Sequence, residues 1–395
     1  MPLRGGFSGH FCDLDVGESS LMRVVFAPDS FKGTITAAEA ARVLADAWRD
    51  VDPEAQIVLR PMADGGEGTV AAFAAAVPDA ERMPIIVTGP AGVPVDTSWL
   101  LLQASDDAPH GTAVIDLAST SGIELLDQLR PWDVDTTGFG QAVAAALDHG
   151  VSRLVLGIGS SASTDGGTGM LRALGARFLD RAGQSIAPGA RGLSALASVD
   201  LSALRAAPEV LVLTDVTNPL TGPRGAAEVF GPQKGLTDAA DRAAADAGLA
   251  RLAELLDLDA TVPGAGAAGG VGGALVAWGA RLLPGAEEVA RLIGLADAVA
   301  GSDVVVTGEG SYDGQSGDGK VPSFVAALAA NAGARAALVA GRITTDADTG
   351  PFAVSVSLTE LAGSPASALA EPTRWLHEAG RRLARDLPAR DLPAR

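Results

Sequence analysis

The most constraining feature of this sequence is a regular alternation between short apolar runs and longer segments with a helical period. The apolar runs consist mainly of Val, Leu, Ile and Ala, which is typical of strands buried on both faces. Because most runs are followed by a helical segment, the pattern predicts parallel sheets covered by helices, and the fold class is α/β. The predicted strands are 23–27, 56–60, 113–117, 152–157, 210–214, 303–307 and 336–340, and the predicted helices are 36–50, 68–76, 137–149, 166–175, 237–256, 271–282, 286–293, 322–332 and 365–386.

Two stretches interrupt this alternation and predict the domain organisation. Residues 85–110 contain prolines and alternating polarity, which favours a short antiparallel excursion, and residues 263–273 are rich in glycine. We therefore expect two domains: a discontinuous Rossmann- or flavodoxin-like parallel-sheet domain and an inserted mixed α/β domain, with the active site in the cleft between them. The predicted boundaries are 1–21 for a disordered extension, 22–84 and 280–386 for the outer domain, 85–279 for the inserted domain and 387–395 for a tail.

Composition excludes several classes of function. The 395-residue chain has a formal net charge of −19, which disfavours binding to nucleic acid or acidic lipid, and its single Cys excludes a disulfide framework. No apolar run approaches the about 18 residues that a membrane-spanning helix needs. We expect a cytoplasmic protein, monomeric or homodimeric, that acts on small molecules.

Three glycine-rich loops place a carboxylate just after a predicted buried strand. They are 64–69, 165–169 and 308–315. In parallel α/β sheets the ligand crevice lies beyond the carboxyl ends of the strands, and glycine loops can turn backbone N–H groups toward an anion. The three loops together predict a phosphate-binding cleft, although any one of them alone is compatible with a simple tight turn.

The lysines support the same interpretation. Of the 29 basic residues only Lys32, Lys234 and Lys320 are Lys, and each lies near glycine in a predicted loop. A compact ammonium suits phosphate binding, although three remaining surface lysines are the alternative. No His lies in these loops, so a general base must be a carboxylate, and carboxylate oxygens also suit Mg²⁺.

One segment of the sequence is compatible with a different function. The segment Gly157-Ile-Gly-Ser-Ser-Ala162 follows a predicted strand and matches the pattern GxGxxA, with Asp180 about 20 residues further on. This pattern is compatible with an NAD-type dehydrogenase of a small hydroxy acid. A non-catalytic sensor of a nucleotide or metabolite is a third possibility.

Five longer motifs, taken in order, resemble those of the bacterial glycerate kinase family. They are APDSFKG at 27–33, ADGGEGT at 63–69, GIGSSASTDGGTGM at 157–170, DVTNPLTGPRGAA at 215–227, and TGEGSYDGQS at 307–316 continuing to GKVP at 319–322. The resemblance runs from about residue 22 to residue 380. It implies ATP- and Mg²⁺-dependent phosphorylation of a hydroxyl of glycerate, on a two-domain α/β fold unrelated to the P-loop kinases.

On this resemblance we predict the residues of the site. Asp165 is the first candidate for the general base and Asp64 the second, with Lys32 as a further catalytic residue. Asn218 is a candidate for a bond to a substrate hydroxyl, with a plain Asn-Pro turn as the alternative. The predicted residues for binding substrate and ATP are Ser30, Gly65, Gly66, Glu67, Ser160, Ser161, Gly166, Gly167, Asp215, Asn218, Arg224, Lys234, Gln315 and Lys320, and those for the metal are Glu309 and Asp313.

Overall fold

The structure is a computed structural model that describes residues 21–31, 33–314 and 320–388. Two predicted site residues, Lys32 and Gln315, lie outside the described residues, as do residues 1–20 of the predicted extension and 389–395 of the predicted tail. Within the described ranges, no helix is long and apolar enough to cross a membrane.

Five strands of the described chain form a wholly parallel sheet, which we call the first sheet. Its order is β13 (Val354–Ser357), β12 (Arg335–Ile343), β11 (Val304–Tyr312), β1 (Arg23–Phe26) and β2 (Gln56–Leu59). Numbered along the chain, this is the 2-1-3-4-5 order of flavodoxin-like doubly wound sheets, which confirms the predicted parallel α/β class. The order reverses between β1 and β11, and such a switch point is where ligands bind in open sheets of this kind.

Helices cover both faces of the first sheet, because alternate strand residues point to opposite sides. Val24 and Phe26 face one cluster and Val25 faces another. The helices on the first side are α1 (Ala37–Arg49), α13 (Leu358–Ala362), α14 (Pro365–Ala370) and α15 (Pro372–Asp386), and those on the second are α11 (Leu295–Val299) and α12 (Val321–Asn331). The predicted start of α1 is supported, because the Thr36 side chain accepts a hydrogen bond from the backbone N–H of Glu39 at 3.2 Å.

The second sheet is mixed. Its order is β10 (Arg281–Leu283), β9 (Glu209–Leu213), β6 (Arg153–Gly157), β5 (Thr112–Asp116), β4 (Pro94–Leu102) and β3 (Glu81–Thr88). The four strands from β10 to β5 are parallel, whereas β4 and β3 are antiparallel, as the prolines of 85–110 predict. A separate antiparallel pair, β7 (Arg177–Leu179) and β8 (Ser198–Asp200), lies outside this sheet.

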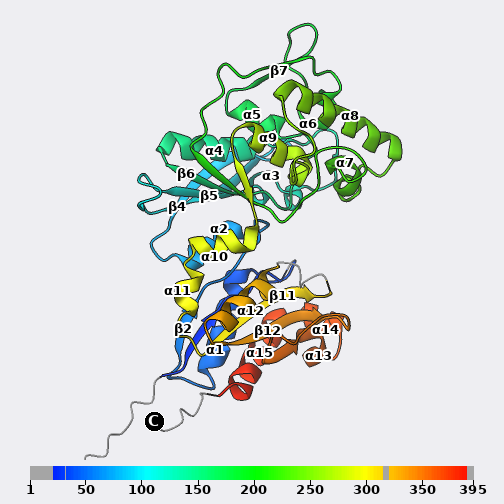
Figure 1. Cartoon of the computed structure of the whole chain (residues 1–395). Coiled ribbons are helices and arrows are strands. Elements are labelled where there is room, and N and C mark those ends of the chain that lie inside the picture. The colour runs from blue at the N-terminus through cyan, green and yellow to red at the C-terminus, as the bar shows by residue number, and fades with distance from the viewer. Residues whose placement is uncertain (1–20, 32, 315–319, 389–395) are drawn as a thin grey trace, which may run out of the picture.

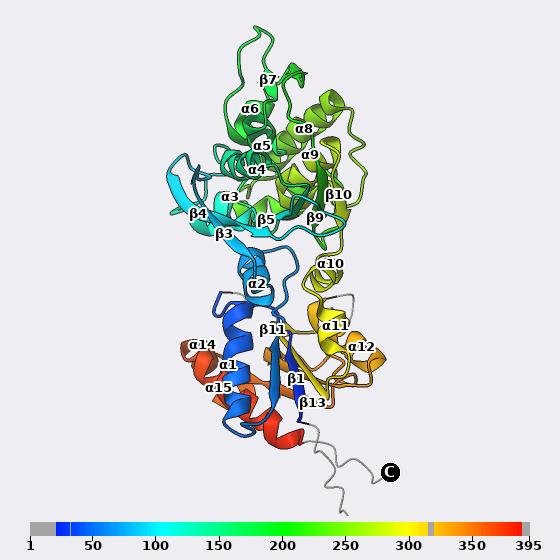
Figure 2. The same ribbon diagram turned by 90° about the vertical axis from the view of Figure 1, so that its left-hand side faces the viewer.

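The second sheet is also covered on both faces. One face carries helices that include α4 (Thr137–His149), α5 (Thr168–Ala173), α8 (Ala239–Leu256) and α9 (Val271–Ala277), with α3 (Ala118–Ser121), α6 (Gly189–Leu193) and α7 (Ala226–Phe230) nearby. The other face packs against α2 (Thr69–Ala76) and α10 (Gly285–Leu292), which lie between the two sheets in both views (Figures 1 and 2). One apolar cluster therefore continues from the underside of the second sheet to a face of the first.

Some sequence predictions need correction at element boundaries. The segment 365–386 is two helices because the chain leaves the helical region at Glu371, and the helix predicted at 271–282 ends at Ala277. The strand β10 that follows has three residues, too few to show a period. β3 begins at Glu81 and β10 ends at Leu283, so the chain passes between the two sheets before residue 81 and after residue 283.

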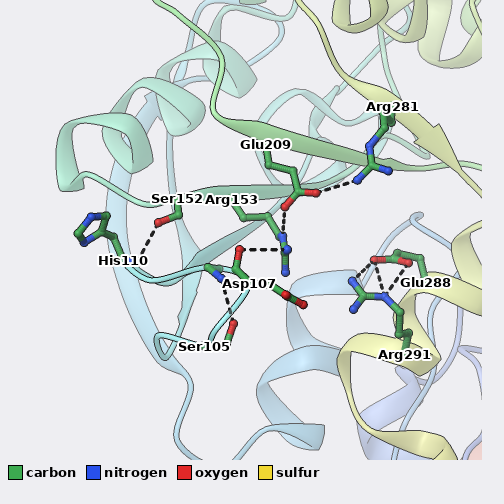
Figure 3. Close-up of polar contacts among 10 residues, drawn as sticks. Ser105, Asp107, His110, Ser152, Arg153, Glu209, Arg281, Glu288 and Arg291 are labelled. Atoms are coloured by element: carbon green, nitrogen blue, oxygen red, sulfur yellow. Dashed lines mark hydrogen bonds and ion pairs between the residues drawn. The ribbon is translucent and has the colours of Figure 1, made fainter.

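A polar network ties together the amino ends of the strands in the second sheet (Figure 3). Arg153, the first residue of β6, is 7% exposed and bonds the Glu209 carboxylate at the start of β9 at 2.5 Å. Arg281 at the start of β10 bonds the same carboxylate at 2.7 Å. Burial raises the pKa of the Glu209 carboxyl, but the hydrogen bonds and charges of the two arginines outweigh burial and hold that pKa below its usual value.

Replacing Glu209 with Gln is expected to lower the free energy of unfolding by about 1–3 kcal/mol, because the largely buried Arg153 loses its carboxylate. Urea denaturation measures this change. Glu254→Gln is the matched control, since it breaks an ion pair with Arg251 in which both side chains are exposed, and it should cost under about 0.5 kcal/mol. Equal effects of the two variants would contradict a structural role for the network.

Candidate active site

Loops from the carboxyl ends of both sheets surround three adjoining cavities. The outer cavity, of about 620 Å³, lies against the first sheet, and the central cavity, of about 560 Å³, lies between loops of the two sheets. The inner cavity, of about 340 Å³, lies against the second sheet. Outer and central cavities share Ser30, Asp64 and Asp215, and central and inner cavities share Ser160 among others, so the three form one continuous cleft.

The outer cavity combines apolar walls with charged groups. Phe31, Leu358 and Leu369 contribute apolar surface. The predicted metal residues Glu309 and Asp313 also line it, as does Lys320, whose Nζ lies 3.6 Å from an Asp313 carboxylate oxygen. The apolar walls suit a flat aromatic ring, and the ammonium of Lys320 suits a phosphate.

The central cavity contains most of the residues predicted from the ADGGEGT motif. Asp64, Gly65, Gly66 and Glu67 line it. Asp64 lies just after β2 and is partly exposed, and its Oδ1 accepts a hydrogen bond from the backbone N–H of Gly66 at 2.9 Å. This bond fixes the carboxylate where the outer and central cavities meet.

Asp215 reaches the same junction from the second sheet. It follows β9 and is exposed, and its Oδ1 accepts a hydrogen bond from the backbone N–H of Gly285 at 2.9 Å. Gly285 opens α10, and a Cβ there would lie 2.0 Å from the backbone oxygen of Asp64. The absence of a side chain at Gly285 therefore allows the loops that carry the two carboxylates to approach closely.

The inner cavity is lined by Ser160, Ser161 and Lys234. Lys234 is 3% exposed, and its Nζ donates to Ser161 Oγ and to the backbone oxygen of Ser163, both at 2.6 Å. Burial lowers the pKa of Lys234 to about 7, although the charge of Asp165 acts in the opposite direction. Ser160 has a φ of 57°, a left-handed conformation that is uncommon outside glycine and clusters at binding sites.

The two candidate bases lie in different surroundings. Asp165 is completely buried, lines none of the cavities described, and has a carboxylate that accepts five hydrogen bonds. The donors are the backbone N–H groups of Thr136, Gly167 and Gly169 and the hydroxyls of Thr136 and Ser163. In this structure the Asp165 carboxylate organises its own loop, whereas Asp64 lies at the junction of two cavities.

Four further predicted binding residues do not line the cavities described. Gly166 and Gly167 are buried, and their backbone N–H groups bond the Gly269 oxygen and Asp165, so they offer no donors to an anion. The side-chain amide of Asn218 bonds the backbone oxygen of Arg224, which favours the turn interpretation. Arg224 itself is exposed and lines none of the cavities described.

The structure adds cleft residues that the sequence reasoning missed. Arg342 and Thr359 line the outer cavity, and Glu124 lines the central one. Arg342 lies near the carboxyl end of β12, just past the predicted strand at 336–340. Because ligands bind beyond the carboxyl ends of parallel strands, this position could have identified Arg342 as a candidate from the sequence. Glu124 lies within the single 3-10 turn Ile123–Leu125, which is too short to show a period.

The glycines of the dinucleotide-like pattern have another use. The backbone N–H of Gly159 donates to the oxygen of Gly65 at 3.0 Å, and a Cβ on Gly159 would lie 2.5 Å from the Cα of Gly66. A Cβ on Gly157 would lie 2.7 Å from the oxygen of Gly65. We call these four residues the glycine seam. Because backbone occupies this space, the pattern does not leave room for a pyrophosphate over these glycines.

Taken together, the doubly wound sheet and the carboxylate-lined cleft define an α/β enzyme that binds small molecules at the carboxyl ends of its strands. Comparison with known proteins gives the family. A model of the glycerate kinase family matches residues 24–388. The chain belongs to the glycerate kinase family.

Individual relatives agree with this assignment. The chain is 41% identical over 336 residues to the glycerate 2-kinase of Escherichia coli (strain K12), covering 82% of this chain and 86% of that protein. It is 40% identical over 339 residues to a glycerate kinase of Bacillus subtilis (strain 168), covering 83% and 87%. The crystal structure of a putative glycerate kinase 2 from Salmonella typhimurium LT2 superposes with a TM-score of 0.78 at 37% identity, covering 93% and 98%.

Proposed function

We propose that this protein transfers the γ-phosphoryl group of ATP to a hydroxyl of glycerate. The observation that carries the proposal is the meeting of Asp64 and Asp215 at the junction of adjoining cavities, in a chain of the glycerate kinase family. The known relatives named as glycerate kinases support the substrate, and family membership supports ATP as the phosphoryl donor.

The cavities suggest how the two substrates are arranged. ATP occupies the outer cavity, where apolar side chains contact the adenine and Lys320 lies near the phosphates. Glycerate approaches from the inner side. Its hydroxyl oxygen attacks the γ-phosphorus, the bond from that phosphorus to the bridging oxygen breaks, and ADP leaves. Most of the catalysis then comes from positioning and from neutralising charge.

Asp64 is the proposed general base. It lies where the outer and central cavities meet and accepts the proton of the attacking hydroxyl. Ser30, Gly65, Gly66, Glu67, Ser160 and Asp215 line the central cavity and are retained as binding residues. Lys32 and Gln315 keep the roles that the family resemblance implies.

The donor set fits Mg²⁺ delivered together with the nucleotide. The described residues contain no group of three or more His, Cys, Asp or Glu side chains placed to hold a metal alone. Mg²⁺ commonly takes one or two protein carboxylates and completes its shell with phosphate oxygens and water, and Glu309 and Asp313 of the outer cavity are suitable oxygen donors. When bound, Mg²⁺ neutralises phosphate charge.

Turnover with defined products tests the proposed function. The purified protein is incubated with ATP, Mg²⁺ and each of a panel of short hydroxy acids, and ADP is measured alongside phosphorus NMR of the acid product. We expect one ADP for each phosphoglycerate formed. Reduction of NAD by a hydroxy acid would instead support the dehydrogenase alternative, and ATP binding without ADP release would support the sensor.

A further inference from the structure

The inner cavity contains donors that protein groups leave unused. A lysine ammonium has three N–H donors, and Lys234 uses two of them on Ser161 Oγ and the oxygen of Ser163. Since Ser161 Oγ accepts from Lys234, its own hydroxyl proton must point elsewhere, and no described protein group accepts it. One ammonium proton and one hydroxyl proton therefore remain for an occupant of the cavity that both residues line.

The surroundings of Lys234 favour an anionic occupant. Burying a charged group is costly unless an opposite charge or hydrogen bonds compensate it. The charge of the buried Asp165 carboxylate acts on Lys234, but that carboxylate already accepts hydrogen bonds from its own loop and from Thr136. Both direct acceptors of Lys234 are neutral, so a negatively charged ligand would supply the compensation that the protein does not.

The size and position of the inner cavity indicate that this anion is the carboxylate of the small acid and not a phosphate of the nucleotide. The inner cavity, at about 340 Å³, is smaller than the outer cavity, at about 620 Å³, and Lys234 is the one charged residue in its described lining. It opens through shared residues, including Ser160, onto the central cavity where the transfer takes place. A three-carbon acid held at its inner end therefore presents its hydroxyls toward Asp64.

We propose that Lys234 and Ser161 form the subsite that binds the carboxylate of glycerate. This inference rests on the proposed function and assigns the two ends of the cleft. The inner end recognises the acceptor acid and the outer end, with Lys320, recognises the nucleotide. A compact ammonium with an adjacent hydroxyl matches the two oxygens of one carboxylate.

Calorimetric titration of the full chain tests this subsite without depending on turnover. Glycerate and its neutral carboxamide, glyceramide, are titrated into the wild-type protein, and we expect glycerate to bind at least 10-fold more tightly. In Lys234→Met we expect glycerate affinity to fall at least 100-fold and this preference to disappear. In Ser161→Ala we expect a loss of about 10-fold, which corresponds to about 1.4 kcal/mol. Thermal melting identifies any variant that fails to fold. If Lys234→Met does not fold, the glycerate affinity of Ser161→Ala tests the subsite.

Lys320→Met provides the opposite signature. It should weaken binding of a non-hydrolysable ATP analogue and leave glycerate affinity within 2-fold, whereas Lys234→Met and Ser161→Ala should leave the analogue within 2-fold. Unchanged glycerate affinity in Ser161→Ala would overturn the subsite. So would a folded Lys234→Met protein that loses affinity for the ATP analogue and keeps its affinity for glycerate. A wild-type protein that does not prefer glycerate to glyceramide would also overturn it. Glycerate binding that depends on Lys234, without any phosphorylation, would overturn the proposed function and leave the subsite standing.

Discussion

Replacing Asp64 with Asn is expected to lower kcat by about 10²–10⁴-fold, the usual contribution of a general base. The amide cannot accept the hydroxyl proton, yet it preserves the shape of the side chain and one oxygen for the N–H of Gly66. Because Asp64 is partly exposed and lies at a cavity junction, we expect the variant to fold normally. Steady-state kinetics with ATP and glycerate, together with thermal melting, measure both effects.

Asp215→Asn is the comparison variant for Asp64. Asp215 lines the same two cavities and is likewise held by a backbone N–H, that of Gly285. Because its proposed role is to bind substrate and not to accept the proton, we expect a smaller loss of kcat with a larger change in KM. If Asp215→Asn lost most of the turnover while Asp64→Asn kept near-normal rates, the base would be Asp215. Near-normal rates in both variants would remove the carboxylates at this junction from the mechanism.

The second large effect is on stability and concerns Asp165. Replacing it with Asn is expected to lower the free energy of unfolding by at least about 3 kcal/mol. The new amide group would direct its own N–H atoms at buried donors that now bond a carboxylate oxygen, leaving several of them without an acceptor. Turnover should fall because the loop loses its shape and not because a base is removed.

Urea denaturation and protease resistance measure this loss, and Asp259→Asn is the matched control. Asp259 is exposed and accepts two hydrogen bonds from Thr261 in a surface turn, so its replacement should cost under about 1 kcal/mol. An Asp165→Asn protein with wild-type stability and abolished turnover would contradict the structural role and restore Asp165 as a candidate base.

The contrast between Asp64 and Asp165 shows where sequence reasoning reached its limit. Both are followed by two glycines after an apolar run that predicts a strand, so the local patterns are equivalent. What separates them is contact with segments far along the chain. A Cβ on Gly166 would meet the side chain of Leu252 at 2.4 Å, and the N–H of Gly166 bonds the oxygen of Gly269. Local spacing cannot reveal that α8 and the 267–270 turn close over one loop and not the other.

More of the fold than of the site could be predicted from the sequence, because the apolar runs that mark the strands also form the centres of the sheets. The apolar runs located β1, β6, β9 and β11, and the break at 85–110 located the antiparallel hairpin. Short edge elements such as β10 were missed because a three-residue strand is defined by its pairing with β9 and not by its own composition. The exact points where the chain changes sheets depended on those short elements.

The glycine seam has a consequence for how the two sides of the cleft respond to their ligands. Where bare main chain rests on bare main chain, there is no side chain that can rotate aside to absorb a displacement. We therefore expect a shift of the loop after β2 to move the loop after β6, which leads to Ser160 and Ser161.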